Sequence, residues 1–389
     1  MTKDLDGLTV LSLEQATTLP FLTYRLACDG ARVIRVEHRA RPDPNRFVGR
    51  DVLGEPDMRA YFLPNNCGKE AITLNLGDPA GRALLHELIA RLPVDVFATN
   101  QRPRSYARLG IDADTLRAVR PELIWLGISG FGPDHDEAAY DPILQARAGF
   151  MSLTGEPDGP PTPFGLPMVD LGAAEHAYGE VMKALYRRAR GAGGARLDVS
   201  MFRSAVSWMA SPVALDSVGE RVVRRGSAHQ FFAPVGVHAT GDGHVYVAVG
   251  NDEQWKVLAA LPAFEGVDRP EYAVNAGRIA DLPRLHAALD AKFAALTTEA
   301  ALALLREAGV PIAAVAALPA VVRDPLVAEH LVHVRDARSG LTLALPAPPT
   351  GEPPPLSFPP RLGEHNETVY GALGYAPAQV ADLHRRGVV

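Results

Sequence analysis

The sequence predicts an α/β protein that has a large parallel-sheet domain and a smaller α+β domain. Over the first 130 residues, short β-rich runs alternate with segments of helical periodicity. Strands that alternate with helices in this way form a parallel sheet with helices on both faces. Much later, two strand patterns flank an Asp-Gly turn, which predicts an antiparallel hairpin instead. The length of 389 residues also exceeds what one hydrophobic core usually serves.

The strands of the large domain are short apolar runs bounded by turn residues. A helical segment at 21–27 joins the first two strands as a βαβ unit. A second helix is predicted from Asp78 to about Arg91, because Pro79 suits the first position of a helix. The predicted strands cover 8–13, 31–37, 71–76, 94–99 and 122–129.

A long amphipathic helix is predicted to begin at Asp170. Basic residues crowd its carboxyl end, where the helix dipole favours cations, and the glycine-rich run at 191–194 ends it. Residues 196–202 are expected to form a further strand or strand end. The apolar face of the helix consists of Leu171, Ala174, Tyr178, Val181 and Leu185.

A change of sequence texture at about 224–234 marks the start of the smaller domain. The hairpin follows it, with its turn at Gly241–Gly243, and two helices are predicted at 281–296 and 298–308. Near Asp324 the chain leaves this domain. The expected segments are therefore 1–224 for the first part of the large domain, 225–325 for the small domain and 326–389 for the C-terminal part.

The C-terminal part contains a proline-rich stretch at 345–360. Such a composition favours an extended strap over a surface rather than packed structure. A short helix is predicted after it, from about Pro377.

The amino-acid composition of the chain limits the kinds of molecule that it is expected to bind. The net charge of -6 and the sequence pI of about 6.1 give no concentrated basic face, so we expect neither nucleic acid nor an anionic membrane as a partner. Cys28 and Cys67 could pair, but two cysteines in a chain of this length are typical of reduced thiols. The charged N-terminal residues do not resemble a signal peptide, and no apolar run reaches about 18 residues. These features predict a cytoplasmic protein that binds small molecules or another subunit.

Three familiar site patterns are weak in this chain. Glu37 ends the second strand where a ribose-binding acid often lies, but the turn EQATTLP after the first strand lacks the glycines that admit a pyrophosphate. Ser129 follows a strand within GISGFG without the spacing of a hydrolase nucleophile. The DHDE run at 134–137 has metal-ligating groups, yet such clusters are more often solvated loops.

Asp170 is the acidic residue on which two interpretations meet. An aspartate just before an amphipathic helix is typically an N-cap, whose carboxylate accepts the first free backbone N–H groups. The same N–H groups and the helix dipole would stabilise the ionised form, which is the form that acts as a nucleophile. The residues alone therefore permit a nucleophilic Asp170 without selecting it.

Eight stretches of the chain match one known enzyme family in their order and spacing. They are GLTVLSLEQATTLPFLTYRLACDGARVIRVE at 7–37, NCGKEAITLNLGDPAGRALL at 66–85, LIWLGISGFGPD at 123–134, AYDPILQARAGFMSLTGEPDGPP at 139–161, MVDLGAA at 168–174, LDVSMF at 197–202, APVGVHATGDGHVYVAVGNDEQW at 233–255 and RLGEHNETV at 361–369. On these stretches the chain resembles the family III CoA-transferases, which include formyl-CoA and carnitine CoA-transferases and 2-methylacyl-CoA racemases.

The resemblance implies an intertwined homodimer. Each subunit would have a Rossmann-like large domain built from both termini, so that 326–389 returns to it, and a small domain inserted late in the chain. The family's nucleophile falls on Asp170. Its carboxylate would attack an acyl-CoA to give a mixed anhydride, and then form an aspartyl-CoA thioester that passes CoA to an acceptor acid. This chemistry implies no metal and no tightly bound cofactor, with coenzyme A and acyl-CoA as substrates.

The resemblance also assigns binding residues. The family pattern places CoA against His38, Leu74, Asn100, Arg102 and Arg108, although a solvated loop charge is the alternative for the two arginines. Contacts to the acyl group or to the oxyanion are expected from Thr17, Tyr140 and Gly250, and an ordinary strand end is the alternative at Gly250. The run TNQRPR at 99–104 departs from the family's E-N-F-R-P-G, which puts contacts at Thr99, Gln101 and Arg104 in doubt.

These features predict a CoA-transferase that moves CoA from an acyl-CoA, with succinyl-CoA as the expected donor, to a short dicarboxylate. One alternative is a 2-methylacyl-CoA racemase. Racemases of the family carry a His-Asp pair where this chain has Tyr140 and Asp141, and tyrosine lacks a base that titrates near neutrality, which favours transfer. The other alternative is a protein that binds CoA without turnover, in which replacement of Asp170 would change nothing.

Overall fold

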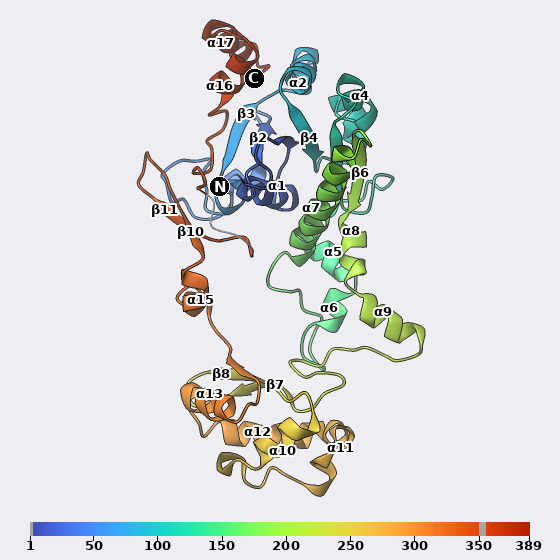
Figure 1. The fold of residues 1–389 in the computed structure, drawn as a ribbon, viewed down its shortest axis with the longest axis vertical. Coiled ribbons are helices and arrows are strands. Elements are labelled where there is room, and N and C mark those ends of the chain that lie inside the picture. Colours follow the sequence, from blue (N-terminus) through green and yellow to red (C-terminus); the bar gives the residue numbers. More distant parts are fainter. Residues whose placement is uncertain (1–2, 350–354) are drawn as a thin grey trace. The chain divides into compact units, whose positions relative to one another are not determined.

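A computed structural model describes residues 3–349 and 355–389 of the chain. The chain forms two compact units (Figure 1). The first contains Met1–Ala148, Gly165–Ala210 and Leu326–Val389, and the second contains Gly149–Phe164 and Ser211–Pro325. The first unit therefore draws on both ends of the sequence.

The first unit is built around one parallel sheet, which confirms the α/β prediction. Within the described ranges its strands are β1 (Thr9–Leu13), β2 (Arg32–Glu37), β3 (Lys69–Thr73), β4 (Val94–Thr99), β5 (Ile124–Ser129) and β6 (Ala195–Ser200). They lie in the order β3-β2-β1-β4-β5-β6, and every neighbouring pair is parallel. The order reverses between β1 and β4. In open α/β sheets, a crevice opens at the carboxyl ends of the strands at such a switch point.

The third strand differs slightly from its prediction. It covers Lys69–Thr73, whereas 71–76 was expected. The Leu74 N–H still bonds the Glu37 carbonyl, but the Asn75 N–H donates to the carbonyl of Val388 (2.8 Å). The apolar pattern therefore continues beyond the strand because the chain turns there to pack against its own C-terminal residues.

Helices cover both faces of the sheet. On one face α1 (Thr18–Cys28) packs against α7 (Met168–Ala189), which in turn lies on β5 and β6. The other face forms an apolar core with α2 (Pro79–Arg91), α4 (Ala113–Val119), α16 (Asn366–Ala372) and α17 (Pro377–Arg385). Successive strand residues alternate between faces, so Ile34 and Val36 join this core while Arg35 and Glu37 point to the α1 side.

The predicted hairpin is confirmed in the second unit. Strands β7 (Val235–Ala239) and β8 (His244–Ala248) pair antiparallel, and β9 (Ile312–Ala314) extends them to a three-stranded sheet. Three helices pack on this sheet through an apolar core that includes Trp255, Leu289 and Leu305. They are α10 (Asp252–Ala259), α12 (Leu282–Phe293) and α13 (Thr298–Glu307).

The remaining α-helices and strands are short. They are α3 (Tyr106–Leu109), α5 (Asp141–Arg147), α6 (Phe150–Leu153), α8 (Met201–Ser207), α9 (Ala210–Ser217), α11 (Asn275–Ala280), α14 (Leu318–Val321), α15 (Pro325–Ala328), β10 (Leu331–Arg335) and β11 (Thr342–Pro346), with β10 and β11 paired antiparallel.

The predicted segments 1–224, 225–325 and 326–389 stay a prediction, and the two compact units group two stretches differently. Residues 149–164 and 211–224 lie with the second unit. There the Arg224 guanidinium donates to the carbonyl oxygens of Ser152, Glu156 and Gly159. The apolar pattern of the sequence does not reveal this cross-connection.

The proline-rich strap is partly packed, contrary to expectation. Leu345 lies in β11 and is 5% exposed, and Leu356 and Phe358 pack against apolar clusters of the first unit. The Gly68 N–H donates to the carbonyl of Ser357 (2.9 Å). Residues 350–354 of the predicted strap lie outside the described residues. Prolines in a strand edge are compatible with this packing because the unpaired side needs no N–H donor.

Candidate active site

Two neighbouring cavities open in the first unit beyond the ends of β1, β2 and β4. The nucleotide cavity, as we call it for reference, has a volume of about 270 Å³ and its wall includes Leu13, His38, Leu74, Leu76 and Arg108. The aspartate cavity has a volume of about 170 Å³ and its wall includes Ala16, Thr18, Arg102, Tyr140 and Asp170. Gln15 and Gln101 line both cavities. The two spaces therefore meet at these glutamines, which lie after β1 and β4.

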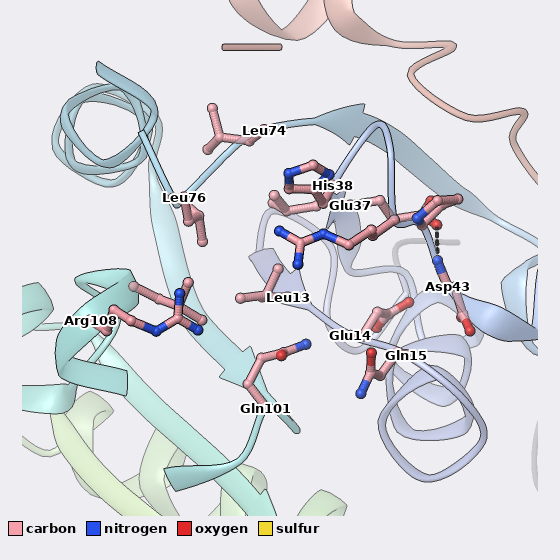
Figure 2. A pocket seen from close by; sticks show the side chains of 15 residues that line it. Leu13, Glu14, Gln15, Glu37, His38, Asp43, Leu74, Leu76, Gln101 and Arg108 are labelled. Atoms are coloured by element: carbon pink, nitrogen blue, oxygen red, sulfur yellow. Dashed lines mark hydrogen bonds between the residues drawn. The ribbon is translucent and has the colours of Figure 1, made fainter. Parts of the chain in front are cut away.

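The nucleotide cavity brings together three of the predicted CoA-binding residues. Figure 2 shows Arg108 and His38 facing the cavity from different sides, with Leu74 and Leu76 along its wall. The Arg108 side chain is solvent-exposed. His38 Nδ1 accepts a hydrogen bond from the Ala40 N–H (3.0 Å), so the neutral ring carries its proton on Nε2. The cavity thus combines apolar walls with two arginines, Arg41 and Arg108, three carboxylates and one imidazole.

The aspartate cavity contains Asp170 and most of the polar groups around it. Asn100 and Arg102, predicted to bind CoA, line this cavity rather than the other one. Tyr140 also lines it and is 72% exposed. The wall also includes one histidine, His135, and the carboxylates of Asp136 and Glu137.

The N-cap interpretation of Asp170 is wrong. Helix α7 begins at Met168, with Pro167 at the cap position, so Asp170 lies inside the first turn. The cap is supplied by Asp141, whose Oδ2 accepts from the N–H groups of Val169 (2.7 Å) and Asp170 (3.1 Å). Asp141 is 6% exposed, and its other oxygen accepts from the side-chain amide of Gln145 (2.6 Å). The free helical N–H groups are therefore satisfied from α5, and the Asp170 carboxylate stays available.

The Asp170 carboxylate is less acidic than a free aspartate. Burial raises its pKa to about 6, a hydrogen bond from the Thr18 hydroxyl opposes this rise, and the charge of Asp141 adds to it. The expectation that the helix end would favour the ionised form thus fails here, because Asp141 occupies the N–H groups that would have done so. A carboxylate that is partly desolvated yet ionised at neutral pH is a better nucleophile than one fully hydrated.

Thr18, the neighbour of the predicted Thr17, contacts Asp170, and the role expected of Thr17 stays a prediction. Thr17 is 7% exposed and precedes α1, whereas Thr18 lines the aspartate cavity and donates its hydroxyl to Asp170 Oδ1. Two adjacent threonines carry the same signal in a sequence. Only the entry angle of α1 decides which one reaches the carboxylate.

Asn100 binds the protein's own backbone. Its side-chain oxygen accepts from the Gln15 N–H (3.1 Å), and its side-chain nitrogen donates to the Gln15 carbonyl (2.7 Å). Both ends of the amide are therefore used to hold the turn after β1. Its predicted role in contacting CoA stays a prediction, with these two bonds as the observed contacts.

Gly250 lies in the second unit, directly before α10. Its N–H donates to Oε1 of Gln254 (2.8 Å), and Asn251 caps the helix by accepting from the Gln254 N–H (2.9 Å). The predicted oxyanion donor is thus paired within its own helix start. It would have to leave Gln254 in order to serve a substrate.

Sequence reasoning missed four residues around Asp170: Gln15, Thr18, Gln101 and Asp141. Asp141 lies in an Asp-Pro pair at the start of α5, but it is the first helical residue there and not the cap, so this pattern did not reveal its contact with α7. Gln101 fell in the run that departs from the family pattern. No feature of the sequence pointed to Gln15.

The described residues present neither a metal site nor a membrane-spanning helix. No group of three or more His, Cys, Asp or Glu side chains in residues 3–349 and 355–389 has the arrangement of a metal site. No helix in that part of the chain has both the length and the apolar content that a membrane crossing requires.

Comparison with known proteins gives one consistent family. The model of CoA-transferase family III matches residues 5–366. The mouse protein named succinyl-CoA:glutarate CoA-transferase is 29% identical, over 100% of this chain and 90% of that protein. The Streptomyces avermitilis protein named formyl-CoA:oxalate CoA-transferase is 32% identical over the full length of both. A crystal structure of a CAIB/BAIF family protein from Brucella suis covers 96% of this chain with a TM-score of 0.85 and 29% identity. The chain therefore belongs to family III of the CoA-transferases.

Proposed function

We propose that this enzyme moves CoA from an acyl-CoA to a short dicarboxylate through covalent intermediates on Asp170. The observation that carries the proposal is the carboxylate of Asp170 at a cavity that adjoins, through Gln15 and Gln101, a second cavity bearing Arg108. A nucleophile thus lies within reach of a space suited to an extended anionic thioester. The family membership supplies the reaction class.

The proposed reaction begins when an Asp170 oxygen attacks the thioester carbonyl carbon. A C–O bond forms, the C–S bond breaks, and CoA leaves as a thiolate, so a mixed anhydride remains. The thiolate then attacks the aspartyl carbonyl, which releases the donor acid and leaves an aspartyl-CoA thioester. The acceptor carboxylate attacks this thioester to give a second anhydride, and the thiolate returns to the acceptor's carbonyl. Asp170 is regenerated as a carboxylate.

The two cavities divide the substrate between them in this proposal. The nucleotide end of CoA lies in the nucleotide cavity, with His38 and Leu74 against it and Arg108 on a phosphate, since a guanidinium matches phosphate oxygens well. The acyl end enters the aspartate cavity past Gln15 and Gln101. Arg102 is the permanent cation that lines this second space in the described residues, and it offers a partner for an anionic group there.

The substrate class is drawn from the family relatives. The names of two relatives specify glutarate and oxalate as acceptors, and succinyl-CoA is the donor named for one of them. We infer that this enzyme likewise accepts a short dicarboxylate, with succinyl-CoA as the donor. The volume of about 170 Å³ at Asp170 supports a small acyl group.

We further infer an intertwined homodimer in which the C-terminal segment completes the large domain and Gly250 of the small domain contributes an oxyanion donor. Large apolar side chains that stay exposed support a subunit interface, among them Trp208 (43%), Val213 (56%) and Val218 (78%). Light scattering on the purified protein gives the molar mass, and a monomer would contradict this inference.

A racemase is the second candidate, and the geometry disfavours it. Racemisation needs a base on each side of the α-carbon. Tyr140 occupies the aspartate cavity where a family racemase has histidine, and the ordinary pKa of a tyrosine is about 10. Asp141 is already engaged as the α7 cap. We therefore expect no deuterium incorporation at the α-carbon of 2-methylacyl-CoA substrates.

The proposal is tested by the intact mass of the enzyme after mixing with succinyl-CoA. A covalent adduct is expected on the peptide that contains Asp170, and hydroxylamine should convert it to a hydroxamate. Peptide mapping locates the modification. If a panel of acyl-CoAs leaves the mass unchanged while α-proton exchange occurs, the racemase is the correct assignment.

The Thr18 hydroxyl bond predicts a shift in pH dependence. Adduct formation should fall as pH drops through about 6, because Asp170 must be ionised to attack. Thr18→Val removes a hydrogen bond that favours the ionised form of Asp170. The acid limb, meaning the fall in the rate of adduct formation at low pH, should therefore move to higher pH by about one unit. Thr18→Ser keeps the hydroxyl and serves as the control. An unmoved limb in Thr18→Val would contradict the role assigned to this bond.

Arg108 should contribute to CoA affinity rather than to chemistry. Arg108→Met is expected to raise the KM for acyl-CoA about tenfold with little change in kcat, since a phosphate contact is equal in the ground and transition states. Arg104→Met is the matched control, because Arg104 is an exposed arginine in the turn just before α3 but lines neither cavity. Equal KM values for the two variants would refute the placement of CoA.

A further inference from the structure

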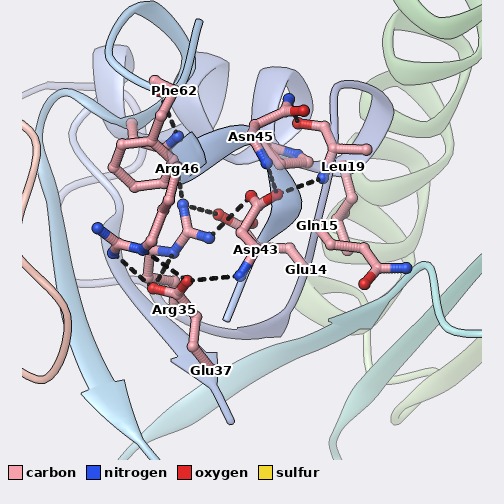
Figure 3. Close-up of polar contacts among 12 residues, drawn as sticks. Glu14, Gln15, Leu19, Arg35, Glu37, Asp43, Asn45, Arg46 and Phe62 are labelled. Atoms are coloured by element: carbon pink, nitrogen blue, oxygen red, sulfur yellow. Dashed lines mark hydrogen bonds and ion pairs between the residues drawn. The ribbon is translucent and has the colours of Figure 1, made fainter. Parts of the chain in front are cut away.

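A cluster of six buried charges lies on the α1 side of the sheet, beneath the turn that follows β1. Three are carboxylates and three are cations, so the formal charges balance, and each side chain is at most 3% exposed. Figure 3 shows the contacts at its centre. The members are Glu14, Arg35, Glu37, Asp43, Arg46 and Lys69. Glu14, Glu37 and Asp43 also line the nucleotide cavity, but none of the six is a reacting group in the proposed mechanism.

The cluster is held together by charge-assisted hydrogen bonds. Arg46 donates two hydrogen bonds to the Glu37 carboxylate, from Nε (2.8 Å) and from Nη2 (2.6 Å). Lys69 donates one to Glu14 (2.8 Å). Burial alone would raise the pKa of Glu37, but Arg35 and Arg46 lower it to about 2. Buried ion pairs of this kind contribute little net stability, yet they fix the geometry of the groups they contact. The question is therefore which group the cluster holds in place.

Asp43 connects this cluster to the turn between β1 and α1. Its Oδ2 accepts from Arg35 (3.1 Å), and its backbone N–H donates to Glu37 (3.1 Å). Its other oxygen, Oδ1, accepts from the backbone N–H of Ala16 (3.0 Å). The same oxygen also accepts from the Asn45 N–H (3.0 Å). One carboxylate is thus oriented by the buried charges, and Ala16 is the residue of the β1–α1 turn that it contacts.

That peptide group belongs to a residue in an unfavourable conformation. Ala16 has φ of 62°, and it is the non-glycine residue with positive φ in the described part of the chain. This region costs free energy for any residue with a Cβ atom, so contacts from outside must hold it. Asp43 holds its N–H, and the Asn45 side chain donates to its carbonyl (2.8 Å). The bend at Ala16 turns the chain into α1, whose first residue is Thr18.

We propose that Asp43 is a positioning residue for the nucleophile: by holding Ala16 in its left-handed conformation, it places the Thr18 hydroxyl on the Asp170 carboxylate. This inference rests on the proposed function of Asp170. The chain of contacts runs from the buried charges to Asp43, then to Ala16, and two residues further to Thr18 and Asp170. Asp43 reaches the reacting carboxylate only through this turn, so it acts by geometry.

Other charged groups also face Asp170 and act on its carboxylate independently of Asp43. Asp141 on α5 contacts the Asp170 backbone, and Arg102, His135, Asp136 and Glu137 line the same cavity. These groups come from other elements than the β1–α1 turn. A change at Asp43 leaves them in place, so its effect on Asp170 should pass through Thr18.

The test measures the rate of adduct formation on Asp170 with saturating succinyl-CoA from pH 5 to pH 8. Asp43→Ala is expected to slow the reaction about tenfold at pH 7, because a small displacement of a reacting group is costly. Its acid limb should move to higher pH by about one unit, as for Thr18→Val, since both lose the same hydrogen bond to the ionised form. In the Thr18→Val background, Asp43→Ala should cause no further shift, because two changes on one pathway are not additive.

Asp336→Ala is the matched control. Asp336 is also a buried aspartate of the first unit paired with an arginine, Arg361 (2.9 Å), but it contacts neither cavity. It should lower the melting temperature and leave the acid limb of adduct formation where the wild type has it. If Asp43→Ala behaves like this control, Asp43 is merely structural and the proposal fails.

Two further outcomes have defined meanings. If Asp43→Ala does not fold, Asn45→Ala decides the question, since it removes only a neutral bond to the Ala16 carbonyl and should move the limb in the same direction. An unchanged limb in Asn45→Ala would overturn the proposal. If the wild type forms no adduct on Asp170, the proposed function has failed. If the wild type forms the adduct but the pH shifts caused by Thr18→Val and Asp43→Ala are additive, the positioning role of Asp43 is refuted and the proposed function stands.

Discussion

Asp170→Asn is expected to abolish CoA transfer, with a loss of about ten-thousandfold or more in turnover. The amide keeps the size of the side chain and an acceptor for Thr18, but it cannot form the anhydride. Turnover is measured by chromatography of the acyl-CoA products, and the covalent adduct should vanish with it. Substantial activity in this variant would show that Asp170 is not the nucleophile. Retained binding of CoA would separate a chemical defect from a folding defect.

The same variant should be at least as stable as the wild type at pH 7. The pKa of Asp170 is raised by burial from 3.8 to about 6, so the folded state disfavours the ionised carboxylate. This cost is fully present above pH 6, shrinks as pH falls from 6 towards 3.8, and is gone well below pH 3.8, where the carboxyl is protonated in both the folded and unfolded states. The melting temperature of Asp170→Asn should therefore exceed that of the wild type at pH 7 and approach it near pH 4. Lower stability of the variant at pH 7 would contradict this reading of the site.

Asp141→Ala should have the second-largest effect, because it removes the cap of α7. The N–H groups of Val169 and Asp170 lose their acceptor inside the protein, and the Gln145 amide loses a partner. We expect the free energy of unfolding to fall by about 2 kcal/mol. Transfer should slow about a hundredfold, since the backbone that carries the nucleophile is no longer anchored. Removal of the nearby charge should also move the acid limb to lower pH, opposite to the effect of Thr18→Val.

A matched cap in the same unit separates stability from catalysis. Asp112 caps α4 by accepting from the Thr115 N–H (2.9 Å), and it lines neither of the two cavities. Asp112→Ala should cost about 1 kcal/mol of stability through the lost cap and leave the transfer rate and its acid limb unchanged. Chemical denaturation and the adduct assay are run on both variants. If they lose activity equally, Asp141 acts on stability alone.

The local elements could be predicted from the sequence because each depends on neighbouring residues. The strands β1, β2, β4 and β5 follow runs of apolar residues, and α2 begins at Asp78-Pro79, where the cap and the proline act within one turn. The parallel sheet follows from the alternation of strands and helices. The single residue Asp170 was identified through the resemblance to a family, and the family is confirmed.

The tertiary structure decided which side chains act on Asp170. Thr18 meets Asp170 across 152 residues of sequence, and Ala16 meets Asp43 across 27. Asp141 takes the cap that was expected of Asp170 itself. Residue type and spacing determine helix faces and strand runs, since those depend on contacts a few positions apart. A hydrogen bond between distant segments depends on how the sheet order brings them together. The sequence therefore determined the fold class and singled out Asp170 as the proposed nucleophile, while packing of α1, α5 and α7 determined the surroundings of Asp170.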